Sequence, residues 1–253
     1  MTALWYATRG TGVVALLLLT ATVALGIAAT ARFATPRWPR LMTAGLHRHL
    51  SLLVVAFVAV HVATAVLDPF APIGWAAAVV PFGASYRPLW LGLGAVAFDL
   101  LIAVVVTSLL RARLGYRTWR AVHWLAYASW PVALWHGLGT GTDSRLTPMI
   151  GLDVACAAAV ACAAAWRISL LPGVRRRVAA SSACLAIALA TVTFMAAGPL
   201  QPGWARRAGT PVRLLTPNAA GRAAGPRVIG PLAGLTAAGQ AAAGPAAAGR
   251  ARS

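Results

Sequence analysis

The sequence contains neither lysine nor glutamate, and its four acidic residues are all aspartate. The lack of lysine excludes a P-loop lysine and a Schiff-base lysine, and the lack of glutamate excludes an HExxH zinc site. Charged residues make up only 10% of the 253-residue chain, whereas hydrophobic residues make up 60%. A soluble domain carries about 25% charged residues. The composition therefore argues against a water-soluble enzyme and indicates an integral membrane protein.

Cysteine is also scarce, at three residues, and the sequence has no CxxC or CxxCH motif. Covalent c-type haem attachment and a zinc ribbon are thereby excluded. Cys156, Cys162 and Cys184 lie within long apolar runs, where small side chains fill helix–helix contacts. No glycine-rich nucleotide-binding fingerprint is found either.

The basic residues are abundant: 22 arginines against four aspartates give a formal net charge of +18. In a soluble chain this balance would indicate nucleic acid as a partner. Here the arginines fall between long apolar runs, so membrane topology explains them better. We therefore expect the arginines to lie at the surfaces of a lipid bilayer, and we expect no nucleic acid as a partner.

Six stretches are apolar enough to cross a bilayer, for which about 20 residues are needed in a helix. They show no strand-like alternation, which predicts an all-α, polytopic six-helix transmembrane bundle. The predicted domains are a short N-terminal segment (1–11), the bundle (12–200) and an Ala/Gly/Pro/Arg-rich disordered tail (201–253). The predicted spans are Gly12–Ala31, Leu46–Leu67, Leu89–Leu110, Trp119–Leu138, Met149–Leu171 and Val178–Leu200.

The arginines between the spans predict the orientation. Three alternate loops are arginine-rich, whereas the loops between them hold only Arg87 and Arg145. By the positive-inside rule the rich loops are cytoplasmic, so both termini are expected outside the cell membrane. The arginines of the three rich loops are Arg32, Arg37, Arg40 and Arg48; Arg111, Arg113, Arg117 and Arg120; and Arg167, Arg175, Arg176 and Arg177.

All five histidines fall in the second and fourth predicted spans, which run in the same direction. Ionisable residues within membrane spans are rare, costly and usually functional. His47 and His123 fall near the cytoplasmic ends of their spans, and His61 and His136 fall near the outer ends. We therefore predict two cross-helix pairs, His47 with His123 and His61 with His136, one in each leaflet.

The spacings support this pairing for one helix and leave it open for the other. His47 and His61 are 14 residues apart, which returns them to within roughly 40° of one helix face, whereas His49 is roughly 120° from His61. His47 is therefore the preferred candidate, with His49 as its alternative. The 13 residues from His123 to His136 leave about 140° of mismatch in a straight helix. A kink at Pro131 could correct it.

Neutral imidazoles from facing helices are good axial ligands for haem iron. The four histidines thus predict two b-type haems stacked along the membrane normal. A zinc ion is less suitable, because the pairs are roughly 20 Å apart along the helix axes and neither has an adjacent carboxylate or thiol. Ordinary hydrogen bonds between helices are the structural alternative.

The segments LHRHLSLLVVAFVAVH (Leu46–His61) and WRAVHWLAYASWPVALWHGLGTGTD (Trp119–Asp143) resemble the ferric reductase-like transmembrane domain. This family includes ferric reductases, the NADPH oxidase membrane domain and the membrane subunit of the methionine sulfoxide reductase system. The resemblance covers about residues 10–200. It implies a six-helix core whose His pairs, 13 or 14 residues apart on two helices, ligate two b-type haems.

The sequence departs from this family in two respects. The histidine-bearing spans are the second and fourth, whereas they are the third and fifth in much of the family. No FAD- and NAD(P)H-binding module accompanies them. We therefore expect a separate flavin reductase or a membrane quinol as electron donor, and an extracytoplasmic acceptor such as ferric iron, oxygen or a redox partner protein.

Haem propionates are anionic and require arginine or polar donors at the membrane interface. Arg48, beside His47, is the preferred candidate. Membrane topology alone would also explain the other arginines near the pairs, which are Arg113, Arg117 and Arg120 at the cytoplasmic end and Arg87 and Arg145 at the outer end. Asp99 lies in the middle of the third span, where a carboxyl could hydrogen-bond or relay protons, and the sequence does not choose between these roles.

The first hypothesis is thus a transmembrane electron conduit of the ferric reductase-like type. The second is a haem-binding membrane anchor for a separate soluble oxidoreductase. Reduction of a ferric chelate by the purified chain alone would favour the first. The third is a haem-free transporter or scaffold. Transporters tend to have broken helices in repeated halves, and the sequence has no convincing internal repeat.

Overall fold

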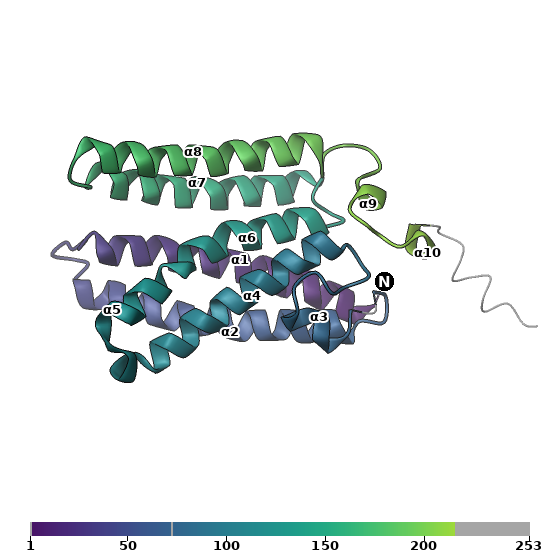
Figure 1. Ribbon diagram of the computed structural model, residues 1–253, viewed down its shortest axis with the longest axis horizontal. Helices are drawn as coiled ribbons and strands as arrows, with labels where there is room; N and C mark the ends of the chain where they lie inside the picture. Colours follow the sequence, from purple (N-terminus) through teal and green to yellow (C-terminus); the bar gives the residue numbers. More distant parts are fainter. Residues whose placement is uncertain (1, 72, 216–253) are drawn as a thin grey trace, which may run out of the picture. The chain divides into compact units, whose positions relative to one another are not determined.

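The computed structural model describes residues 2–71 and 73–215, and this part of the chain is helical and contains no strand (Figure 1). Residues 216–253, most of the predicted tail, lie outside it. The long helices are α1 (Ala3–Thr30), α2 (Arg40–Leu67), α4 (Pro88–Leu109), α7 (Thr147–Ser169) and α8 (Val174–Ala197). The shorter ones are α3 (Trp75–Val79), α5 (Arg111–His123), α6 (Leu125–Thr140), α9 (Trp204–Arg207) and α10 (Val212–Leu215).

The five long helices are long and apolar enough to cross a membrane, and they coincide with five of the six predicted spans. The all-α, multi-pass architecture is therefore confirmed. Helix α1 begins nine residues earlier than predicted and takes up most of the expected N-terminal segment. Its start is fixed by Thr2, whose hydroxyl accepts a hydrogen bond from the Trp5 amide at 3.0 Å. Such a cap satisfies an amide that has no partner within the helix.

The fourth predicted span differs from the expectation, because it is divided between α5 and α6. The two helices meet at Trp124, where the Tyr127 amide bonds to the Trp124 carbonyl at 3.1 Å in a tighter, three-residue turn. Pro131 lies inside α6, which continues through it, so the predicted kink at Pro131 is not where the chain is interrupted. A second kink, at Gly115 (φ 75°), separates the start of α5 from the helix that carries His123.

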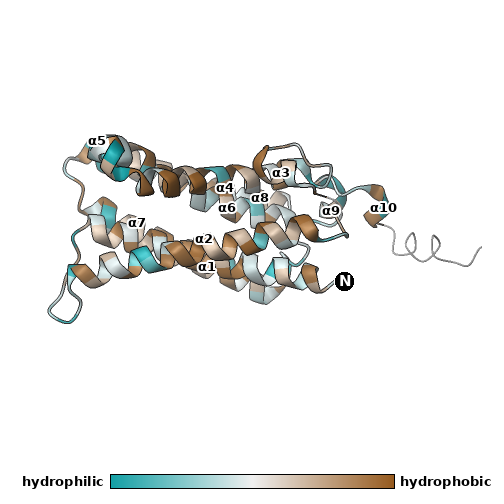
Figure 2. Cartoon of the chain, turned by 90° about the horizontal axis from the view of Figure 1, so that it is seen from below, coloured by the Kyte–Doolittle hydropathy of each residue, from teal (hydrophilic) through white to brown (hydrophobic). Residues whose placement is uncertain are grey.

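The helices pack as two close pairs, α1 with α2 and α4 with α6. Helix α1 also contacts α6 and α7, and α8 lies against α7 at the periphery (Figure 1). Helices α2 and α6, by contrast, have almost no direct backbone contact. The main buried cluster centres on Trp130, Leu134 and Leu138 of α6, packed against Val23 and Ile27 of α1. The outward surfaces of the long helices are largely apolar, as lipid contact requires (Figure 2).

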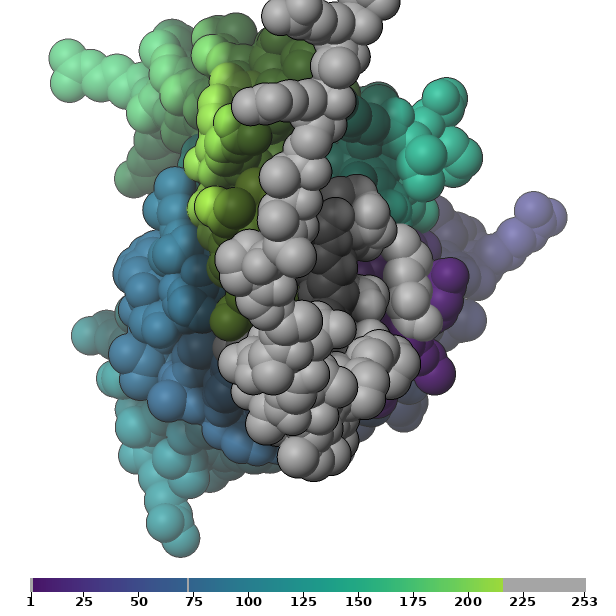
Figure 3. All heavy atoms as spheres, turned by 90° about the vertical axis from the view of Figure 1, so that its right-hand side faces the viewer, coloured from purple at the N-terminus to yellow at the C-terminus, as the bar shows by residue number. Residues whose placement is uncertain are grey.

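We call residues 199–215 the strap, and residues 201–215 were expected to belong to the disordered tail. They instead form α9 and α10 and run over the end of the bundle at which the N-terminus lies. The Arg87 amide donates to the Gly209 carbonyl at 3.1 Å, and Arg145 donates to the Pro199 carbonyl at 3.0 Å. The end-on view in Figure 3 shows the strap, in yellow-green, beside the green end of α8. The strap has no periodic apolar face, and these hydrogen bonds attach it to the bundle instead.

Candidate functional site

Four histidine rings face one another as two pairs, in the combination that the sequence predicts. The ring centres of His61 and His136 are 6.2 Å apart, and those of His47 and His123 are 6.3 Å apart. The ring planes are inclined by 85° in the first pair and by 72° in the second. His49 is exposed and belongs to neither pair. We call His61 and His136 the outer pair, and His47 and His123 the inner pair.

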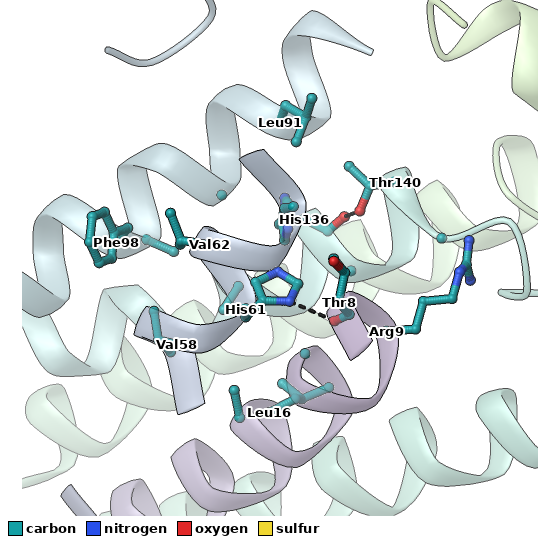
Figure 4. A pocket seen from close by; sticks show the side chains of 18 of the residues that line it. Thr8, Arg9, Leu16, Val58, His61, Val62, Leu91, Phe98, His136 and Thr140 are labelled. Atoms are coloured by element: carbon teal, nitrogen blue, oxygen red, sulfur yellow. Dashed lines mark hydrogen bonds between the residues drawn. The ribbon is translucent and has the colours of Figure 1, made fainter. Parts of the chain in front are cut away.

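Three of the four rings are held by a backbone carbonyl of a neighbouring helix. Nδ1 of His61 lies 2.8 Å from the Thr8 carbonyl (Figure 4), and Nδ1 of His47 lies 3.0 Å from the Thr22 carbonyl. Nδ1 of His136 lies 2.8 Å from the Trp90 carbonyl. A carbonyl can only accept, so Nδ1 carries the proton in each ring and Nε2 keeps its lone pair. This tautomer leaves Nε2 available to a metal.

A glycine accompanies each of these carbonyls, four residues later in the same helix. A Cβ atom on Gly12 would lie 2.9 Å from Cε1 of His61, and one on Gly94 would lie 2.5 Å from Cε1 of His136. The corresponding distance from Gly26 to Cε1 of His47 is 3.3 Å. In a helix the carbonyl of residue i already bonds to the amide of residue i+4, so an outside ring can reach it closely only over a small residue at i+4. We call each carbonyl with its glycine a cradle.

The two cradles of α1 repeat at the spacing of the histidines of α2. Thr8–Gly12 and Thr22–Gly26 are 14 residues apart, as are His47 and His61. Because α1 and α2 pack closely side by side, equal spacings bring both rings to equivalent sites. This repeated Thr-x-x-x-Gly pattern is readable in the sequence, but our sequence analysis did not identify it.

His123 is the exception. Its Nδ1 atom is buried and has no hydrogen-bond partner in the described part of the chain. The ring is instead stacked on Trp119, with ring centres 4.9 Å apart and planes inclined by 27°. The inner pair therefore has one ring fixed by a cradle and one fixed by an aromatic contact.

A cavity of about 360 Å³ adjoins the outer pair and is lined by residues of α1, α2, α4 and α6. Its walls are mainly apolar and include Val58, Val62 and Phe98, with His61 and His136 on two sides (Figure 4). The cavity lies where α2 and α6 do not pack against each other. A mostly apolar space with a few convergent polar groups is typical of a cofactor site.

The arginines that the sequence singled out differ in burial. Arg48, the preferred propionate partner, is exposed, as are Arg113, Arg117 and Arg120. Arg87 is buried and donates to the carbonyls of Gly139 and Thr140 at the end of α6, at 3.0 and 2.9 Å. This burial lowers the pKa of Arg87.

Arg87 and Arg145 are thus occupied in holding helix ends, because a helix C-terminus exposes carbonyls that attract a cation. Our sequence analysis missed Arg9, which lines the cavity beside the outer pair. Arg9 forms an ion pair with Asp143 and lies 4.0 Å above the Trp5 ring. In the sequence, Arg9 could have been noticed only as a single arginine one helical turn before Gly12.

Comparison with known proteins identifies the matched part of the bundle. Residues 11–134 match the family described as "Ferric reductase like transmembrane component". This range includes most of α1, all of α2 and α4, and three of the four paired histidines. His136 lies two residues beyond its end. No curated protein and no solved structure matches the chain. The sequence match and the helical bundle agree, and residues 11–134 of this multi-pass membrane protein therefore belong to the ferric reductase-like family.

Proposed function

We propose that this protein carries electrons across the membrane by means of two b-type haems, one held by His61 and His136 and the other by His47 and His123. The observation that carries the proposal is the distance within each pair. An imidazole nitrogen lies about 2.0 Å from a metal that it ligates and about 1.1 Å from the centre of its own ring, so two axial ligands of one iron have ring centres about 6.2 Å apart. The observed distances are 6.2 and 6.3 Å.

The protonation of the rings supports the same role. Iron requires the lone pair of a neutral imidazole, and a hydrogen bond from the other ring nitrogen fixes the ring and increases its basicity. The cradles at Thr8, Thr22 and Trp90 supply such an acceptor for three of the four rings. Hydrogen bonds between helices, the structural alternative, account for Nδ1 of these three rings. They do not account for the pairing of the rings, because no hydrogen bond joins the two histidines of either pair among the described residues.

The packing also agrees with a large planar group between the histidine-bearing helices. Helices α2 and α6 barely touch, and the cavity between the close pairs has apolar walls. Arg9 stands at its outer rim, where it could receive a propionate in place of the predicted Arg48. For the outer site the residues therefore fit haem b in ligand type, ligand distance and surroundings.

Haem supplies an iron atom that gains and loses one electron. The histidines fix two such positions at different depths, since the 14 residues from His47 to His61 correspond to about 21 Å along α2. The apolar residues around them keep ions out of this route. A cytoplasmic flavin reductase or a membrane quinol would give up the electrons, and an acceptor outside would take them, for example ferric iron becoming ferrous.

The test is a reduced-minus-oxidised spectrum of the purified protein, with haem measured per chain. The wild-type protein should contain two low-spin b haems. His61→Ala and His136→Ala should each remove the same haem, and His47→Ala and His123→Ala should each remove the other. His49→Ala is the matched control, because His49 lies on the same helix but is exposed, and it should retain both haems.

A wild-type protein without haem, or variants that each lose both haems alike, would contradict the proposal. Direction is tested separately in sealed vesicles that contain an electron donor, with a membrane-impermeant ferric chelate outside. We expect the chelate to be reduced by wild-type vesicles and not by those with His61→Ala.

A further inference from the structure

The spacing of the three cradles predicts where a fourth cradle, for His123, would lie. The cradle of α4 consists of the Trp90 carbonyl and Gly94. One repeat of 14 residues along α4, the spacing found on α1, leads to Val104 and Ser108. These residues lie near the cytoplasmic end of α4, at the level of the inner pair.

This fourth position lacks both features of a cradle. The Ser108 hydroxyl donates to the Val104 carbonyl at 2.6 Å, so a hydroxyl takes up the lone pair that a histidine would use. Thr107 adds a second, longer bond to the same carbonyl, at 3.2 Å. A serine, moreover, stands where the other three sites have glycine. Helix α4 thus offers His123 no free backbone acceptor here, which explains why its buried Nδ1 atom has no hydrogen-bond partner among residues 2–71 and 73–215.

Trp119 takes the place of the missing cradle. Its indole N–H donates to the Ser108 hydroxyl at 3.2 Å, and its ring is stacked on His123. The Arg111 guanidinium lies 4.5 Å from the centre of the Trp119 ring, which adds a cation–π contact. Ser108, Trp119 and His123 therefore form a chain of contacts from the backbone of α4 to the inner ring.

We propose that Trp119, held by Ser108, is the positioning residue that fixes His123 as a ligand of the inner haem; this inference rests on the proposed function. A ring fixed by stacking keeps its plane but donates no hydrogen bond that would increase its basicity. His123 is accordingly the least firmly held of the four rings, and its contact with Trp119 limits its movement.

The test uses variants that remove the two contacts separately. Trp119→Leu removes both the stacking and the indole N–H. Trp119→Phe keeps a ring face but loses the N–H. Ser108→Ala removes the acceptor of this N–H and also the hydroxyl that donates to the Val104 carbonyl. Trp124→Leu is the matched control, because Trp124 adjoins His123 in the chain but is 60% exposed and contacts Tyr127 instead.

The measurements are the redox midpoint and spin state of each haem and the binding of carbon monoxide to the reduced protein, none of which depends on turnover. In Trp119→Leu we expect one haem, the one that His123→Ala removes, to become high-spin, to bind carbon monoxide and to be retained roughly tenfold more weakly, in line with the loss of a supporting contact. Trp119→Phe and Ser108→Ala should shift the midpoint of that haem alone and keep it low-spin. Trp124→Leu should match the wild type.

A two-haem protein in which Trp119→Leu leaves the inner haem low-spin and inert to carbon monoxide would overturn the inference. Trp119→Phe and Ser108→Ala are milder variants that should still fold. Equal shifts of the redox midpoints of both haems in these variants would also overturn the inference. A wild-type protein without two haems would instead refute the proposed function, so the two failures are distinguishable.

Discussion

The outer and inner histidine pairs have nearly equal ring distances but are built differently. Both outer rings lie in cradles, at Thr8 and Trp90, beside a mainly apolar cavity. At the inner pair His47 has a cradle, whereas His123 rests on the side chain of Trp119. Equal distances between rings therefore do not mean equal rigidity, because a helix backbone moves less readily than an aromatic side chain.

The surroundings increase this contrast. The outer end is held by the strap: Trp204 donates to the Gly139 carbonyl at 3.2 Å, and its ring centre lies 5.3 Å from that of Trp90. Trp90 is in turn the residue whose carbonyl receives His136. At the inner end, α5 is a largely exposed helix with a kink at Gly115. We therefore expect the outer site to tolerate change poorly and the inner site to adapt.

The largest expected effect comes from filling the cradles. Gly94→Ala would place a methyl group 2.5 Å from the His136 ring, which must then move off the Trp90 carbonyl, whereas Gly26→Ala meets His47 at 3.3 Å. We expect Gly94→Ala to lose most of the outer haem and Gly26→Ala to keep both haems, as measured by haem per chain. Gly45→Ala is the control, because nothing lies within 4 Å of its new methyl group and alanine favours a helix by about 1 kcal/mol.

If Gly94→Ala and Gly26→Ala lost equal amounts of haem, the proposed difference in rigidity between the two pairs would be wrong.

A smaller effect is expected from loosening the strap. Trp204→Ala removes aromatic contacts with Trp90 and Phe194, which are worth about 1 kcal/mol beyond the area that they bury. The outer haem should then be retained roughly fivefold more weakly, and the inner haem should be unchanged. Competition with a haem-binding apoprotein measures both. The control is Trp75→Ala, which changes an exposed tryptophan of α3 and should behave as wild type. If Trp204→Ala weakened only the inner haem, the proposed role of the strap would be wrong.

The smallest effect concerns the ion pair between Arg9 and Asp143 at the rim of the outer cavity. Both side chains are partly exposed, so we expect a coupling of less than about 1 kcal/mol that decreases at high salt. A double-mutant cycle of Arg9→Gln and Asp143→Asn, followed by thermal unfolding in detergent, measures it. If Arg9 also holds a propionate, Arg9→Gln alone should weaken the outer haem more than Asp143→Asn does. If both variants weakened the outer haem equally, Arg9 would act only through its ion pair with Asp143.

Much of the fold could be predicted because lipid imposes long apolar helices, and arginines mark where these end. The pairing of His47 with His123 and of His61 with His136 follows from depth and helix direction, and the structure brings these rings together; their role as ligands remains a prediction. The alternative ligand His49 is exposed, which agrees with its unfavourable angle.

Other features depend on contacts that no local pattern reveals. The interruption at Trp124 arises from a tightened turn, and Pro131, the obvious candidate, lies within a continuous helix. Arg87 and Arg145 are drawn to helix ends that only the folded chain brings near. The strap is rich in residues typical of disorder, and it is ordered here through Trp204 and the Gly209 carbonyl.

The two cradles of α1 have a consequence for how this sequence can change over time. Inserting or deleting one residue between Gly12 and Gly26 would rotate one cradle by about 100° and slide it by about 1.5 Å relative to the other. One histidine of α2 would then lose its acceptor, however well the altered helix still suited the bilayer. Proteins descended from the same ancestor should therefore differ freely in the lengths of their loops, yet hold constant the number of residues between these two glycines.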